Sequence, residues 1–178
     1  MGDSDPGRKV IGLFKRLWHS ISNWWHIATV PSIDRPTLVQ TDPLSPDEIL
    51  LRRILYSQRV EGIFKEGAFD PSSSDTDGIS LFREYFIDAK SVAEAGKNPS
   101  GYYVVRLKYC DLSPLVNESS NEEFQLTIDP TPNDDLPGHV VIREVKRNLA
   151  GDAKGKMRKI KLALAQLANK SECCDYTK

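Results

Sequence analysis

Residues 79–111 constrain the fold more than any other stretch, because they alternate between β-prone and helical composition. ISLFREYFI is rich in β-branched and aromatic residues, and DAKSVAEAGK is helical in character with a glycine near its end. YYVVRLKYCDL has the alternating and β-branched pattern of a strand. A strand, helix and strand over so short a stretch usually pair the two strands in parallel through a right-handed crossover. We therefore expect a parallel strand pair with a helix covering it.

Residues 45–56 carry the signals of another helix. Ser45 is a suitable N-cap, the proline after it fits the first helical position, and Glu48 completes a capping box. Arg52 and Arg53 fall between apolar positions, so at least one of them is expected to face solvent or a binding site. The apolar side chains expected to be buried are Ile49, Leu50, Ile54 and Leu55.

The rest of the chain completes one α+β domain. FQLTIDP and HVVIREV are two more β-prone segments separated by a turn-rich sequence, and GKMRKIKLALAQLA has helical periodicity. At 178 residues the chain is long enough for one domain of ordinary size. We expect an α+β fold with a mixed sheet of four or five strands flanked by helices. The predicted divisions are an N-terminal helical region (1–30), a proline-rich linker (31–44), the domain (45–168) and a tail (169–178).

An amphipathic N-terminal helix is predicted over residues 9–28, where all three tryptophans lie. Apolar side chains recur there every three or four residues, which places them on one helical face. This face would pack against the core of its own domain, a partner protein or a membrane surface, and the sequence leaves these alternatives open. The residues expected to contact a partner or membrane are Phe14, Trp18, Ile21, Trp24 and Trp25.

Charge is unevenly distributed along the chain, although the net charge is only −1. Residues 31–142 hold ten basic and nineteen acidic residues, a net charge of −9, whereas residues 143–170 hold nine basic and two acidic residues, a net charge of +7. The basic segment would dock on its own acidic body, which is the simpler interpretation, or attract a polyanion. Only weak nucleic-acid binding is expected, because few cations share one helical face and no aromatic residues lie nearby for stacking. These cations are Lys154, Arg158 and Lys161.

Several classes of protein are disfavoured by features that the sequence lacks. No apolar run approaches the roughly 18 residues of a transmembrane helix, and three cysteines provide no disulfide framework. We therefore expect a bacterial-type cytoplasmic protein, either free or associated with a membrane face. The histidines and the acidic loop at Asp70, Asp75 and Asp77 match no structural zinc or EF-hand spacing, so no metal is expected.

Two polar residues are candidates for chemistry. Ser80 begins a strand after a loop and Gly78, where side chains often face a cleft; the alternative is that Gly78 makes the turn and Ser80 only alternates outward. His139 begins a later strand, where its imidazole would serve as acid, base or phosphate donor, or would satisfy a backbone carbonyl. With Arg52 or Arg53 clamping a phosphate, these residues are predicted to converge on one pocket.

The sequence contains, in this order, an arginine on an early element, the segment DGISLFREYFIDAKSVAEAGKNPSGYYVVRLKYCDL and two further strands. This order resembles, over residues 52–112, the core of ADP-ribosyltransferase and RNA 2′-phosphotransferase folds. The resemblance implies a split sheet that holds a nicotinamide dinucleotide (NAD), with Arg52 or Arg53 on a phosphate. It also implies that Ser80 is the strand serine and that Asp111 marks a strand end. The alanines matching the helix of these families are Ala89, Ala93 and Ala95.

Two functions of different classes are compatible with these features. The preferred function is that of a non-enzymatic binding or accessory protein, attached to a partner or membrane face through residues 9–28 and needing no cofactor. The alternative is a nucleotide-binding enzyme of ADP-ribosyltransferase-like type with NAD as cofactor. No Glu-x-Glu follows downstream, and Glu144 is the one residue that matches the place of a catalytic acid. The catalytic residues of the alternative would be Arg52, Arg53, Ser80 and His139.

Overall fold

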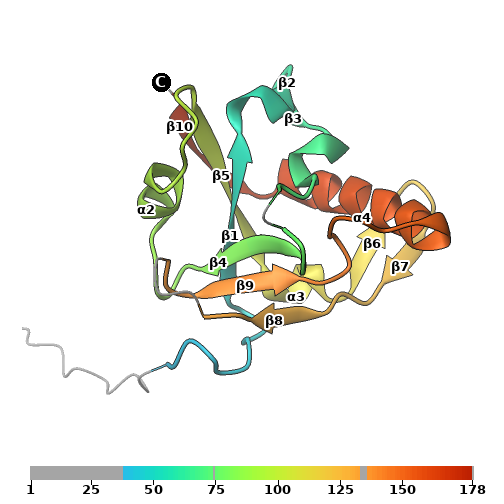
Figure 1. Cartoon of the computed structure of the whole chain (residues 1–178), viewed down its shortest axis with the longest axis horizontal. Coiled ribbons are helices and arrows are strands. Elements are labelled where there is room, and N and C mark those ends of the chain that lie inside the picture. The colour runs from blue at the N-terminus through green and yellow to red at the C-terminus, as the bar shows by residue number, and fades with distance from the viewer. Residues whose placement is uncertain (1–37, 74, 133–135, 178) are drawn as a thin grey trace, which may run out of the picture. The chain divides into compact units, whose positions relative to one another are not determined.

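The computed structural model describes residues 38–73, 75–132 and 136–177 (Figure 1). The chain divides into two units, residues 1–38 and residues 39–178, and the second unit is the domain described below. No helix in the described ranges is long and apolar enough to cross a membrane. The amphipathic helix expected over residues 9–28 lies outside the described residues, and so do its contact residues Phe14, Trp18, Ile21, Trp24 and Trp25.

The domain is built on a six-stranded sheet in which every neighbouring pair of strands is antiparallel. The strand order is β10-β5-β1-β4-β9-β8. The expected α+β class is confirmed, whereas the expected mixed sheet of four or five strands is wrong. The strands are β1 (Ile49–Leu55), β4 (Ile79–Arg83), β5 (Gly101–Lys108), β8 (Ile128–Pro130), β9 (His139–Ile142) and β10 (Glu172–Thr177).

Residues 45–56 form a turn and the central strand β1 instead of the predicted helix. The N–H of Glu48 donates to the oxygen of Ser45 at 3.0 Å, and the N–H of Ser45 donates back to Glu48 Oε2 at 3.2 Å. Beyond this turn, all seven residues of β1 pair with β5. Leu50 is buried on one face of the sheet and Leu51 on the other. A strand in the middle of a sheet buries both faces, so tertiary pairing overrides the local capping signals.

The segment 79–111 contains the predicted strand, helix and strand, as β4, α2 (Ala89–Glu94) and β5. Asp88 caps α2 by accepting a hydrogen bond from the N–H of Ser91 at 2.7 Å. The two strands run in the same direction but are not neighbours, because β1 inserts between them and pairs with both. The predicted direct parallel pairing is therefore wrong.

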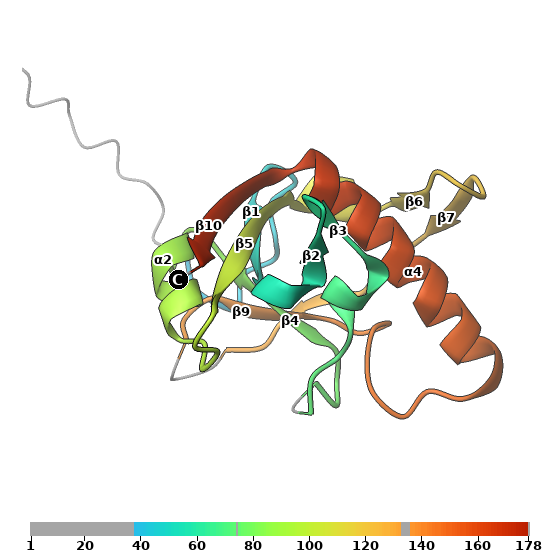
Figure 2. The same cartoon turned by 90° about the horizontal axis from the view of Figure 1, so that it is seen from above.

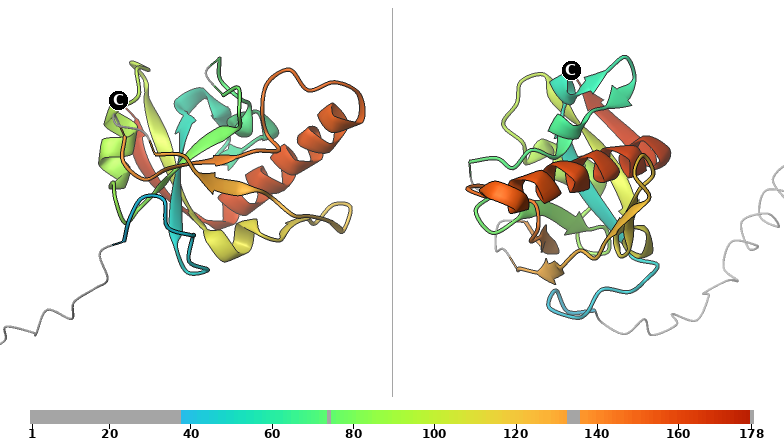
Figure 3. Two further views of the ribbon diagram at one scale, coloured as in Figure 1. Left: turned by 60° about the horizontal axis from the view of Figure 1, so that its bottom comes forward. Right: turned by 90° about the vertical axis from the view of Figure 1, so that its right-hand side faces the viewer.

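The helices α2 and α4 (Gly151–Lys170) pack on opposite faces of the sheet. The face that carries Leu50 and Leu81 packs against α4, which lies across the sheet in the right-hand view of Figure 3. The face that carries Leu51 and Phe82 packs against α2. The C-terminal helix is thus confirmed. The expected tail instead forms β10, which returns from the end of α4 to lie beside β5 (Figure 2).

Short elements connect these layers. They lie between β1 and β4 and between β5 and β8, in two excursions from the sheet. The first excursion holds η2 (Tyr56–Gln58), β2 (Arg59–Val60), β3 (Ile63–Phe64) and η3 (Glu66–Phe69). The second holds α3 (Tyr109–Leu112), β6 (Leu115–Asn117) and β7 (Glu122–Phe124).

Strands β1 and β4 stay paired over only two residues of each strand. Leu50 faces Arg83 and Leu51 faces Phe82, after which the two strands diverge. Figure 1 shows β1 and β5 running at a steep angle to β4 and β9. The first part of β4, from Ile79, continues to pair with β9. The sheet is therefore split between the second half of β1 and the first half of β4.

Candidate functional site

A cavity of about 480 Å³, here named the split cavity, lies where β1 and β4 diverge. Its size is in the range of small-molecule sites. Strands β1, β4, β5 and β9 and the loop before β4 contribute to its walls. It is lined by all four residues that the sequence suggested as a site: Arg52, Arg53, Ser80 and His139. Their convergence is thus observed, and their catalytic role stays a prediction.

Arg52 reaches across the split to β4. The N–H of Glu84 donates to the oxygen of Ile49, the first residue of β1, at 3.0 Å. Every second residue of a strand directs its main-chain groups to the same neighbour, so Ser80, four residues before Glu84, also directs its main-chain oxygen toward β1. Because β1 has diverged at this point, Arg52 Nη1 donates to the oxygen of Ser80 at 2.8 Å. Arg52 Nε is buried and has no hydrogen-bond partner among the described residues. Burial lowers the pKa of Arg52 to about 10, and the charge of Asp75 opposes that shift.

Arg53 lies on the opposite face of β1, since successive side chains of a strand alternate. Its Nη1 donates to the oxygen of Val92 in α2 at 2.8 Å, and its Cζ lies 5.1 Å from the centre of the Tyr102 ring. Burial lowers the pKa of Arg53, and the charges of Tyr102 and Asp75 act in the opposite direction. Arginines from two faces of β1 line one cavity because the sheet is open on this side of the strand.

Neither Arg52 nor Arg53 has an acidic partner in direct contact among the residues that the structure describes. Arg83, Arg106 and Arg143 each form an ion pair with a carboxylate. In the described part of the chain, by contrast, no carboxylate oxygen lies within 4.0 Å of a side-chain nitrogen of Arg52 or Arg53. Within the described ranges, the split cavity therefore has two cationic groups that no acidic contact neutralises.

Asp75 is a buried carboxylate of the loop before β4, with 7% of its surface exposed. Its Oδ2 accepts a hydrogen bond from the N–H of Ser72 at 2.7 Å, and its Oδ1 accepts a longer one from Ser80 Oγ at 3.4 Å. Its main-chain oxygen accepts from the N–H of Arg147 at 3.3 Å. These bonds hold Asp75 at the wall of the split cavity.

Gly78 allows this loop to enter β4 close to β9. Its φ is +153°, and a Cβ atom at this position would lie only 2.3 Å from the oxygen of Ile142. A larger residue would therefore push the two strands apart. Gly78 makes the turn, as one interpretation of the sequence has it, and Ser80 still lines the cavity.

His139 lies on the same face of the sheet as Ser80. Phe82 pairs with His139 and Ser80 with Val141, so Ser80 and His139 are diagonal neighbours. His139 Nδ1 lies 2.9 Å from the oxygen of Thr131 and 2.8 Å from its Oγ1. A protonated Nδ1 donates to the carbonyl oxygen, and an unprotonated Nδ1 accepts from the hydroxyl, so Thr131 engages this nitrogen in either tautomer. Nε2 has no hydrogen-bond partner among the described residues and lies on the imidazole that lines the split cavity.

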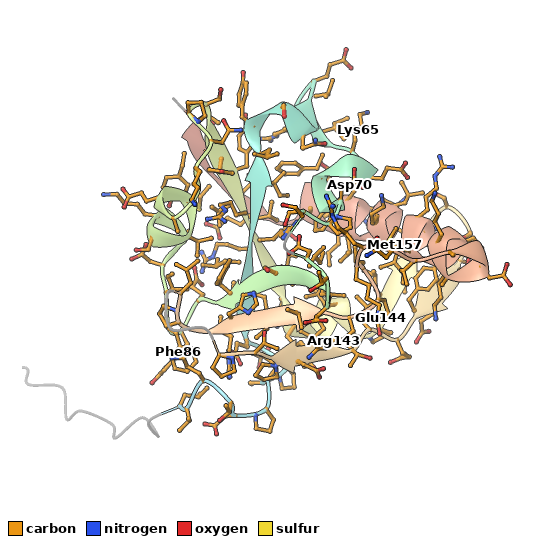
Figure 4. The ribbon with its side chains drawn as sticks, in the orientation of Figure 1. Lys65, Asp70, Phe86, Arg143, Glu144 and Met157 are labelled. Carbon is orange, nitrogen blue, oxygen red and sulfur yellow. The ribbon has the colours of Figure 1, made fainter. Side chains whose placement is uncertain are left out.

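Two residues singled out by the ADP-ribosyltransferase resemblance lie away from the split cavity. Glu144 accepts hydrogen bonds from the N–H of Thr127 at 3.0 and 3.1 Å and borders a separate depression with Met157 (Figure 4). Asp111 lies in α3 and borders another depression, beside Lys170. The residue expected in the place of a catalytic acid is therefore outside this site.

The basic residues of α4 contact acidic residues of their own domain. Lys161, expected on an exposed basic side, is buried and pairs with Asp70, which Figure 4 shows beside α4. Arg158 Nε lies 3.4 Å from Glu66. These contacts favour docking of the basic segment on its own acidic body. Further pairs join Lys159 to Glu122 and Lys170 to Glu118.

Asp75 and Tyr102 line the split cavity, although the sequence does not mark either as part of a site. Asp75 precedes Ser80 by five residues in a polar loop, and Tyr102 lies within an ordinary strand pattern. Both reach the site only because their elements lie beside the diverging end of β1. Among the residues with a described position, no group of three or more His, Cys, Asp or Glu is arranged to hold a metal ion.

The split cavity brings together two arginines that have no acidic contact within the described ranges, a buried carboxylate, a serine and a histidine. No family model, curated protein or solved structure matches this chain.

Proposed function

We propose that the domain binds a small phosphorylated ligand of the nucleotide class in the split cavity. The observation that supports this most strongly is the pair Arg52 and Arg53, which line one cavity and have no acidic contact in the described part of the chain. Guanidinium groups donate in a planar fork that matches phosphate oxygens. The buried Nε of Arg52, which lacks an acceptor among the described residues, is a donor that a phosphate oxygen would satisfy.

The other residues of the cavity suit the remainder of such a ligand. Ser80 Oγ and His139 Nε2 are placed to orient a ribose or a nicotinamide group. Tyr102 and Leu136 provide apolar surface for a flat ring. NAD is one candidate, and the resemblance to ADP-ribosyltransferase folds is the reason for including it.

Binding without ADP-ribosyl transfer is the form of this function that we favour. Glu144 borders a different depression, so the acid that the resemblance would require is not at the split cavity. His139 would supply proton transfer, but proton transfer by itself does not amount to ADP-ribosyl transfer.

The test is a set of thermal-shift and calorimetric titrations with AMP and NAD. A ligand that binds only the native state stabilises it by mass action, by about 2.7 kcal/mol when the free ligand is at 100 times its Kd. The melting temperature rises as a result. We expect at least one of the two nucleotides to raise it. Arg52→Gln and Arg53→Gln are each expected to weaken that binding by about tenfold or more, since each removes a charge-assisted hydrogen bond.

Arg158→Gln is the matched control, because Arg158 is exposed and lies outside the split cavity. It is expected to bind the nucleotide as the wild type does. The proposal fails if neither nucleotide stabilises the protein, or if the two cavity variants bind as tightly as the control.

Residues 9–28 carry a second proposed function, attachment to a partner protein or to a membrane face. Its support is the stripe of apolar side chains in the sequence and the proline-rich linker that follows. A cytoplasmic protein held at a membrane face would combine both functions, with the nucleotide site on the domain and the attachment on its N-terminal segment.

A further inference from the structure

Resting on this proposed function, we infer that the split cavity selects phosphorylated ligands with hydroxyl groups near the phosphate, and that Asp75 recognises those hydroxyls. Ribonucleotides and sugar phosphates have this chemistry. Inorganic phosphate and deoxygenated analogues do not. Asp75 is thus a specificity-determining residue of the site, complementary to Arg52 and Arg53.

Asp75 keeps acceptor capacity that the described residues do not use. A carboxylate offers about four lone-pair positions. Oδ2 accepts a 2.7 Å bond from the N–H of Ser72, whereas Oδ1 accepts only the long contact of 3.4 Å from Ser80 Oγ. No ion pair of Asp75 occurs among the described residues. Since the residue is buried, an acceptor left without a strong donor is unfavourable, and a ligand hydroxyl would supply that donor.

Asp75 lines the same cavity as both arginines. Its charge acts to raise the pKa of Arg52 and of Arg53. Yet no carboxylate oxygen lies within 4.0 Å of their nitrogen atoms among the described residues. Donors for a phosphate and an acceptor for a hydroxyl therefore line the same cavity. A ligand made only of acceptors would place negative charge beside Asp75 and be repelled.

The other acidic residue of the cavity wall is already paired. Asp70 forms an ion pair with Lys161 of α4, which neutralises its charge. Of the acidic residues described at the cavity wall, Asp75 is therefore the one with capacity for a ligand. Its loop is fixed by the bond from Arg147, so the acceptor is preorganised for the ligand.

Calorimetric titration of the full chain with AMP and with 2′,3′-dideoxyadenosine monophosphate tests the inference. The two probes share their base and phosphate, and differ only in the ribose hydroxyls. We expect wild-type protein to bind AMP at least tenfold more tightly than the dideoxy probe. Equal affinity for the two probes would overturn the role of the hydroxyls without affecting the proposed function. The comparison uses wild-type protein alone, so it does not depend on the folding of a variant.

Asp75→Asn tests the residue itself, with Asp77→Asn as the matched control. Asp77 is an exposed acid of the same loop and does not line the split cavity. We expect Asp75→Asn to reduce the preference for AMP to less than about threefold, while Asp77→Asn retains the wild-type preference. A preference that survives in Asp75→Asn would contradict the assignment. If neither AMP nor NAD binds, or if Arg52→Gln binds as tightly as wild type, the proposed function fails and the inference falls with it.

Discussion

Arg52 Nη1 donates to the main-chain oxygen of Ser80 at 2.8 Å, across the point where β1 and β4 diverge. A side chain thereby contacts a carbonyl that a neighbouring strand would bind in a continuous sheet. The bond holds a guanidinium at the edge of the split cavity, where its Nε has no partner among the described residues. The divergence of two strands and the presence of a cationic site are thus one structural feature.

Replacing Arg52 with methionine is expected to separate ligand binding from stability. The guanidinium is desolvated and has no acidic contact with any described residue, so its removal is expected to leave the melting temperature unchanged or to raise it by a few degrees. Nucleotide binding is expected to be lost. Differential scanning calorimetry with and without AMP measures both. A fall of many degrees in the unliganded variant would show that Arg52 serves mainly to hold the fold.

The same residue predicts how stability depends on pH. The pKa of Arg52 in the folded domain, about 10, is below its ordinary value, so between these values the unfolded chain binds more protons than the native one. Unfolding free energy attributable to Arg52 therefore rises as the pH increases above about 10. Urea unfolding at pH 8 and 10.5 measures the unfolding free energy of both proteins. The excess of Arg52→Met over wild type is expected to be smaller at the higher pH. An advantage that grows with pH would contradict the burial argument.

Glu48→Gln is expected to destabilise the domain strongly. Arg83 has none of its surface exposed, forms an ion pair with Glu48, and also donates to the oxygen atoms of Gln40 and Asp42. Removing the carboxylate leaves a buried charge uncompensated, which typically costs about 3–5 kcal/mol. Urea denaturation measures this loss.

Asp47→Asn is the neighbouring control for that experiment. Asp47 pairs with Lys108 at 2.7 Å, but its side chain is 86% exposed. Solvent screens such a pair, so the urea midpoint is expected to stay nearly unchanged. Equal effects of the two substitutions would show that burial of the Glu48 pair is not what matters.

Removing residues 1–30 is expected to leave a folded domain. Residues 39–178 form a unit with hydrophobic clusters on both faces of its sheet. We expect the melting temperature and nucleotide affinity to be retained, while binding to anionic vesicles or to a partner is lost. Circular dichroism and vesicle sedimentation provide the two readouts. A truncated chain that does not fold would show that the N-terminal segment belongs to the core.

Nucleic-acid binding by α4 is expected to be weak. Lys161 is paired with Asp70 and Arg158 lies beside Glu66, so few cations of the helix are available to phosphates. We expect affinities of micromolar order at best, independent of sequence and lost near physiological salt. Fluorescence anisotropy with labelled RNA and DNA at two salt concentrations tests this. Tight binding that persists in added salt would refute it.

Local patterns predicted those elements whose own residues have a clear hydrophobic period or a β-prone or helical composition. The period of Met157, Ile160 and Leu164 identifies α4, and composition identifies β4, α2 and β5. β1 is different, because its Ser45 and Glu48 carry a helix signal that pairing with β5 overrides. β10 has no distinctive period and forms only because α4 returns the chain to the edge of β5.

The candidate site was predictable in part. Four residues of the site have side chains suited to a phosphorylated ligand and a recognisable place in the sequence. Ser80 and His139 each lie at the start of a β-prone segment, and Arg52 and Arg53 lie between apolar positions. Asp75 was not predictable, because its role depends on its burial and on a cavity that it shares with two arginines of β1. The split between β1 and β4 is likewise a property of tertiary pairing, since no residue pattern records where two strands stop pairing.

The central claim is that the split cavity binds a phosphorylated ligand through Arg52 and Arg53. Proton–nitrogen NMR of the full chain during titration with AMP tests it most directly, because arginine Nε–H groups give their own resonances. The account predicts saturable shifts for the Nε–H groups of Arg52 and Arg53 and for the amides of Ser80 and His139. Resonances of the split cavity that do not move, or shifts confined to the exposed basic side of α4, would contradict it.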